Sequence, residues 1–186
     1  MPSSKDNILE NARRLFADHG FKGTTIAQIA KTSNVTDAAI YRHYRSKQDV
    51  FDTIIAKFIE RHSILLGRIH ERQKSGYCLL ETLVLDHCAF VQENMTDMRV
   101  IFSTYTTIPS ARAAIDRMHD NVVATVMACL ERGISDGSVR DDIDKHETAT
   151  IIAILLMGLN RRRIYSPDSP ELARGVVAFC QRSLRS

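Results

Sequence analysis

Polar residues between positions 33 and 47 are of the types that contact DNA. The tripeptide Ser33-Asn34-Val35 separates two short amphipathic segments, residues 25–33 and 36–44. A connection this short forces a tight helix-turn-helix, whose second helix presents its first residues to major-groove base edges while hydroxyls and amides grip phosphates. Asn34 is expected to adopt the left-handed conformation that ends the first of these helices. The spacing alone fits a solvated helical hairpin equally well.

The candidate DNA-contact residues lie at or just after the predicted N-termini of these helices. Threonines there can bind phosphates, small residues allow close approach to bases, and cationic side chains follow. The set is Thr25, Thr36, Asp37, Ala38, Ala39, Tyr41, Arg42, His43 and Lys47. Residues 1–48 carry eight Lys/Arg against four Asp/Glu, although the whole chain has a net charge of only +3. This asymmetry weakly indicates a polyanion-binding N-terminal module.

Apolar residues recur at helical spacing along most of the 186-residue chain, and alternating runs typical of strands are absent. With 44% hydrophobic and 25% charged residues, the composition is that of a folded protein. We expect an all-α fold of about nine helices. Their approximate ranges are 4–19, 25–33, 36–44, 46 to just before 75, 77–94, 97–105, 109–132, 144–164 and 170–184.

The predicted helix ends have recognisable capping residues. Thr25 with Gln28 forms a capping-box pattern, Asp144 with Glu147 a carboxylate analogue of it, and Ser169-Pro170 places a capping side chain before a proline at the first helical position. Gly20 and Gly133 are expected to terminate helices.

Three stretches stand in a characteristic order and spacing: Gly20-Phe-Lys-Gly-Thr-Thr-Ile-Ala-Gln-Ile-Ala, Asn34-Val-Thr, and Ile40-Tyr-Arg-His-Tyr-Arg-Ser-Lys47. In these stretches the sequence resembles the TetR family of bacterial transcriptional regulators. The resemblance covers about the first 60 residues, and the later segments match only in the number and length of helices. The family commonly has Ala-Gly where Ser33-Asn34 stand, and Phe where Tyr44 stands.

The resemblance implies a role for each matched side chain. Thr25, Thr36, Tyr41, His43 and Lys47 would contact phosphates, Ala38 and Ala39 would lie at base edges, and Arg42 would read a guanine. For Tyr41 and His43 the alternative is that they hold the recognition helix against the first helix.

Residues 149–159 are apolar on every side except at Thr150. A helix that covers a single core needs only one apolar side. A subunit partner is the simplest second burying surface, and the resemblance likewise implies a homodimer formed by the last two helices. The candidate interface residues are Ile151, Ile154, Leu155, Val176 and Phe179. Such a dimer predicts a palindromic double-stranded operator. The alternative is a central helix in a monomeric bundle.

We therefore expect a DNA-binding domain at residues 1–48 and a ligand-binding and dimerisation domain at 49–186, with a lever helix starting near residue 47. The function that follows is a ligand-responsive regulator, most simply a repressor, released by a small apolar or amphipathic effector. Candidate lining residues, each of which also fits plain core, are Leu83, Phe90, Met98, Phe102, Met118, Val122 and Met157.

Other functions find little support in the sequence. The hydrolase-like pattern around Ser135 lacks the preceding strand that a nucleophile elbow needs. The histidines show no metal-binding spacing, and we expect no cofactor and no enzymatic activity. No apolar run approaches a membrane span, so a cytoplasmic protein is expected. A helical interaction protein without DNA binding and a thiol-based redox-sensing regulator remain as alternatives, the cysteines being Cys78, Cys88, Cys129 and Cys180.

Overall fold

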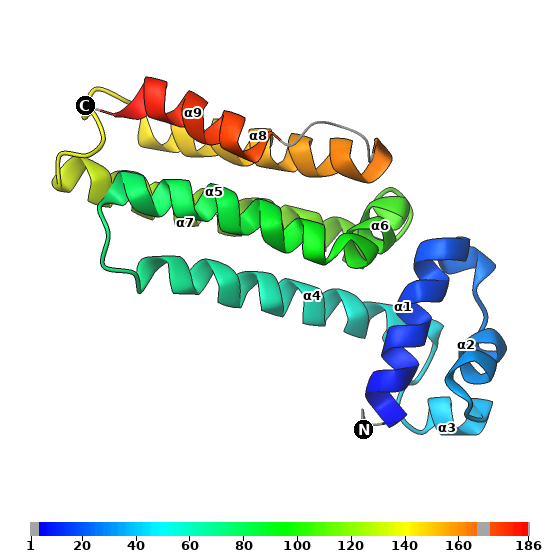
Figure 1. The fold of residues 1–186 in the computed structure, drawn as a ribbon. Coiled ribbons are helices and arrows are strands. Elements are labelled where there is room, and N and C mark those ends of the chain that lie inside the picture. The colour runs from blue at the N-terminus through cyan, green and yellow to red at the C-terminus, as the bar shows by residue number, and fades with distance from the viewer. Residues whose placement is uncertain (1–3, 167–171, 186) are drawn as a thin grey trace. The chain divides into compact units, whose positions relative to one another are not determined.

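A computed structural model describes residues 4–166 and 172–185 (Figure 1). Within these ranges it consists of helices and connecting turns, with no strand, which confirms the all-α prediction. The helices are α1 (Ser4–Gly23), α2 (Ile26–Ser33), α3 (Asp37–Tyr41), α4 (Lys47–His70), α5 (Gly76–Glu93), α6 (Met95–Thr104), α7 (Pro109–Ser135), α8 (Lys145–Tyr165) and α9 (Ala173–Leu184). The predicted cap at Ser169-Pro170 lies outside the described residues.

The chain divides into two compact units. The first comprises residues up to 60 together with 94–115, and the second comprises 61–93 and the residues from 116 onward. The boundary expected after residue 48 falls inside the first unit, because α6 packs along α1 and the first half of α4 belongs with them.

The first unit has an aromatic and aliphatic core. Phe16 and Phe51 are fully buried, and their rings contact Phe21 with centroid separations of 5.6 and 5.1 Å. An ion pair of 3.2 Å joins Arg13 of α1 to Asp97 of α6. The sequence predicted a helix from about residue 97, and α6 begins two residues earlier. Asp97 is only 1% exposed, and the Arg13 guanidinium compensates its buried carboxylate.

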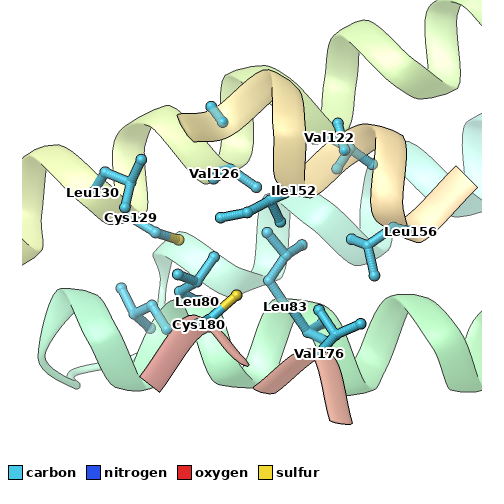
Figure 2. Packing of buried hydrophobic residues seen from close by; sticks show 14 of the residues in the cluster. Leu80, Leu83, Val122, Val126, Cys129, Leu130, Ile152, Leu156, Val176 and Cys180 are labelled. Atoms are coloured by element: carbon cyan, nitrogen blue, oxygen red, sulfur yellow. The ribbon is translucent and has the colours of Figure 1, made fainter. Parts of the chain in front are cut away.

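The core of the second unit is built from the C-terminal part of α4 together with α5, α7, α8 and α9, and Figure 2 shows part of it. Its labelled residues come from α5, α7, α8 and α9 and are Leu80, Leu83, Val122, Val126, Cys129, Leu130, Ile152, Leu156, Val176 and Cys180. Tight packing here explains a wrong prediction: Gly133 does not terminate α7, which continues to Ser135. A Cβ atom on Gly76 would lie 2.0 Å from the Gly133 nitrogen, so glycines permit the start of α5 to touch the end of α7.

Candidate nucleic-acid interface

The turn between α2 and α3 has the predicted geometry. Thr25 caps α2: its hydroxyl oxygen accepts the Gln28 N–H (3.2 Å), while the Gln28 side-chain oxygen accepts the Thr25 N–H (2.7 Å). At the other end Asn34 has φ 55° and ψ 45°, the left-handed conformation expected for it. Its N–H donates to the Lys31 carbonyl, and the next N–H, of Val35, donates to the Ala30 carbonyl. Both the capping box and the asparagine turn are therefore confirmed.

Helix α3 is short and is held by one buried residue. Thr36 caps it by accepting the Ala39 N–H (3.2 Å), and Ile40 is fully buried. The helix ends at Tyr41 rather than at Tyr44, because His43 and Tyr44 both donate to the Ile40 carbonyl in a tight turn toward α4. Tyr44 is 3% exposed and anchors that turn.

The candidate DNA-contact residues of this segment lie mostly on the surface. Thr36, Asp37, Ala38, Tyr41, Arg42 and His43 are exposed, and Ala39 is half-buried. We call these seven residues the α3 face. Tyr41 is 55% exposed, so it does not pack the helix against α1. The hydroxyl proton of Thr36 has no acceptor among the described residues and is free to donate to a phosphate.

Lys47 has a structural role that sequence reasoning missed. Its ammonium donates to the carbonyls of Phe21 and Thr24, both at 2.7 Å, and lies 4.4 Å from the centre of the Phe21 ring. Two of its three N–H groups are thus committed to tying the end of α1 to the start of α4. One remains for the phosphate contact that was predicted.

Comparisons with known proteins address this segment directly. The profile of the family described as "Bacterial regulatory proteins, tetR family" matches residues 8–54, which run from α1 into α4. The transcriptional repressor KstR2 from Rhodococcus jostii is 27% identical over 159 residues, 75% of this chain and 70% of that protein. The segment that carries the candidate DNA-contact residues therefore matches the TetR family.

Other TetR-family relatives match along nearly the whole chain. The transcriptional repressor AcnR from Corynebacterium diphtheriae is 25% identical over 184 residues, 98% of this chain and 92% of that protein. Among solved structures, a transcriptional regulator from Saccharomonospora viridis in complex with choline superposes with a TM-score of 0.82 at 20% identity, covering 98% of this chain and 97% of that one. The fold of both units is thus the fold of TetR-family regulators.

The candidate ligand-lining residues are divided between the two units. Met98 and Phe102 belong to α6 of the first unit. The other candidates belong to the second, where Leu83 and Val122 are core residues and Met157 packs against that core. Met118 is fully buried and Phe90 is half-buried. Their role in ligand binding stays a prediction.

A chain of buried polar side chains crosses the second unit. His62 of α4 and His87 of α5 are fully buried, with 3.1 Å between His62 Nε2 and His87 Nδ1. His87 Nε2 lies 2.9 Å from the amide nitrogen of Asn160 on α8. Among the described residues, His62 Nδ1 has no hydrogen-bond partner. The residues are 25 and 73 positions apart, so no spacing motif could reveal the cluster.

The predicted dimer residues separate into two groups. Ile151, Ile154 and Leu155 on α8 and Phe179 on α9 are between 38% and 57% exposed. We call these four the α8–α9 apolar face. Val176 does not join it, since it points into the core of its own unit and is 9% exposed (Figure 2).

Among the helices that the structure describes, none has the length and apolar character to cross a membrane.

Acidification should destabilise the fold through the two buried histidines. Burial lowers the pKa of His62 to about 4 and of His87 to about 3, from about 6.5 when unfolded. Below pH 6.5 the unfolded chain therefore binds more protons, and the free energy of unfolding falls by about 1.4 kcal/mol per pH unit for each histidine. Urea unfolding at pH 7, 6 and 5 measures this slope.

Two variants separate this effect from other titrations. His87→Gln should lose roughly half of the slope between pH 6.5 and 5, whereas His146→Gln, at an exposed position of α8, should keep it. An unfolding free energy that stays constant over this interval in the native sequence would contradict the assignment.

Proposed function

We propose that this protein is a homodimeric transcriptional repressor that binds a palindromic DNA operator through the α3 face and is released by a small effector. The observation that carries the proposal is the capped, left-handed turn at Asn34, which leaves the α3 face exposed within the segment that matches the TetR family. The named relatives KstR2 and AcnR are repressors, which supports the same sign of regulation.

Each residue of the interface has a distinct role in this proposal. Thr36 and the remaining N–H of Lys47 bind phosphates, which position the protein without reading sequence. Ala38 and Ala39 allow close approach to the bases. Arg42 reads a guanine through its guanidinium, which matches the two acceptor atoms of that base. The overall affinity should fall with salt, because phosphate binding releases counterions.

The α8–α9 apolar face supplies the dimer interface. Four large apolar side chains on neighbouring helices would otherwise remain in water, and a second copy can cover them with the same surface related by a two-fold axis. The α3 faces of the two subunits, related by this axis, require an operator with two inverted half-sites one or more turns of the DNA helix apart.

The second unit provides the effector site in this proposal. One protein of similar fold is described as a ketosteroid transcriptional regulator, and another was solved in complex with choline, which supports a small-molecule site in this fold. Here the buried His62, His87 and Asn160 place polar atoms within a largely apolar bundle, which favours an amphipathic effector over a pure hydrocarbon.

Helix α4 can transmit the effector signal. It has 24 residues, about 36 Å at 1.5 Å per residue, and its residues belong partly to the first unit and partly to the second. An effector that binds one arrangement of α4 more tightly must weaken operator binding by the same factor by which the operator weakens effector binding.

A thiol-based sensor is less well supported. Burial raises the pKa of Cys129 to about 12 and of Cys180 to about 11, so both thiols stay protonated and poorly reactive near neutral pH. Cys88 is buried as well, and Cys78 is exposed.

Replacing Arg42 should change sequence preference more than general DNA affinity. Arg42→Ala should cost about 1–3 kcal/mol on the preferred duplex and much less on a scrambled one, because a base contact is lost. Arg68→Ala, an exposed arginine of the second unit, should leave both affinities unchanged. Fluorescence anisotropy with both duplexes measures this. If the native protein binds no duplex from a genome-derived library at low salt, the proposal would be wrong, and the alternative of a helical interaction protein without DNA binding would be favoured.

Two arginine substitutions two residues apart should have opposite outcomes. Ile154 is 57% exposed and Ile152 is 2% exposed on the same helix. Ile154→Arg should therefore give a folded monomer, whereas Ile152→Arg should unfold the protein because it buries an unpaired charge. Sedimentation with circular dichroism distinguishes the two. A native protein that remains monomeric at tens of micromolar, or an Ile154→Arg variant that stays dimeric, would refute the interface.

A further inference from the structure

A pocket of about 440 Å³ lies in the first unit, beside the C-terminal end of α1. This volume is within the range of small-molecule sites. Three segments of the unit line it: residues 19–23 of α1, Gln48 at the start of α4, and residues around the α6–α7 connection. None of the proposed DNA-contact residues and none of the candidate effector-lining residues is among them, so the pocket is a separate feature.

A break in α1 shapes one wall of the pocket. Gly20 has φ 71° and ψ 169°, which interrupts the helical backbone and turns the chain at this point. A Cβ atom at Gly20 would have no neighbour within 4 Å, so the backbone there faces open space. A ligand could approach this backbone closely, which is a recurrent use of glycine in binding sites.

The pocket has a positive character. Lys22 and His19 line it, and its described lining residues include no Asp or Glu. The Lys22 ammonium has no hydrogen-bond or ion-pair partner among the described residues and is available to a ligand. The Lys47 ammonium adds a second positive charge next to the lining residue Phe21, whose carbonyl and ring it contacts. A partly enclosed site with positive charges nearby and no carboxylate among its described lining residues favours an anionic ligand.

The remaining walls suit the body of an organic molecule. Phe21, Ile108 and Pro109 provide apolar surface. The hydroxyls of Ser103 and Thr107 donate their protons to backbone carbonyls, which leaves the Lys22 ammonium as the donor for an anionic group. The pocket therefore combines a cationic end with apolar walls.

We propose that this pocket binds a small organic carboxylate, with the carboxylate at Lys22 and the apolar part against Phe21 and Ile108. This site is additional to the effector site proposed for the second unit. Residues 19–23 lead directly into Thr25, which caps α2, and Lys47 ties Phe21 to Thr24. An occupant would thus lie next to the residues that hold α2 and the start of α4.

Benzoate and benzamide are matched probes for this site, because they share a ring and differ in charge. The full-length protein without DNA, labelled with ¹⁵N, is titrated with each while the amide signals of Gly20 and Gly23 are followed by NMR. Benzoate should saturate these shifts with a dissociation constant on the order of 1 mM, a reasonable value for a fragment of this size. Benzamide should bind at least tenfold more weakly.

Two lysine variants complete the test. Lys22→Met removes the charge and keeps the side-chain length, and it should weaken benzoate binding at least tenfold. Lys31→Met, an exposed lysine of α2 that does not line the pocket, should leave it unchanged.

Several outcomes would overturn the proposal. These are equal binding of benzoate and benzamide, the absence of shifts at Gly20 and Gly23, and equal loss in both lysine variants. If Lys22→Met weakened duplex binding but left the benzoate titration unchanged, Lys22 would be a phosphate contact to DNA and the pocket proposal would be wrong. The titration contains no DNA, so its result does not depend on whether the protein is a repressor.

Discussion

The backbone turn at Asn34 fixes where the α3 face lies, and much of the functional account depends on it. A left-handed residue lets the chain reverse within three residues while the Ala30 and Lys31 carbonyls are satisfied by the N–H groups of Val35 and Asn34. Helix α1 holds this turn from outside, since the Asn7 amide donates to the Ser33 carbonyl at 2.8 Å. A residue that could not adopt φ 55° would misplace α3, and Ile40 would leave the core.

The second unit meets a different physical demand, because α8 carries apolar side chains on two sides. One side carries Ile152 and Leu156 into the core, and the other carries the α8–α9 apolar face. A helix that is apolar all round is stable in water only when something covers both sides. The buried His62, His87 and Asn160 restrict how α4, α5 and α8 can pack, because separating these side chains would leave further buried polar atoms without partners.

Features set by local chemistry could be predicted from the sequence. The Thr25–Gln28 capping box, the Asp144 cap of α8 and the conformation of Asn34 depend on residues within four positions of one another. The surface position of Arg42 followed from the same local pattern. The pattern of residues 149–159 likewise predicted a helix that is apolar on more than one side, and α8 carries Ile152 into the core and Ile154 on the surface; burial of the second side stays a prediction.

Features set by packing between distant segments could not be predicted. Gly133 lies within α7 and packs closely against Gly76, which is far away in sequence. Lys47 binds carbonyls of the chain that precedes α2, which no charge pattern indicates. Val176 and Phe179 are three positions apart on α9, yet Val176 lies in the core and Phe179 lies on the surface. In each case the outcome depends on which helices pack together and at what depth.

The most direct test of the central claim is to select binding sequences from a random duplex library with the full-length protein and to measure the stoichiometry of the complex. We predict two inverted half-sites whose centres lie one turn of DNA, about 34 Å, or a multiple of it apart, with at least one dimer bound per site. Selection of a single unrepeated half-site bound by one monomer, or no enrichment at low salt, would contradict the account.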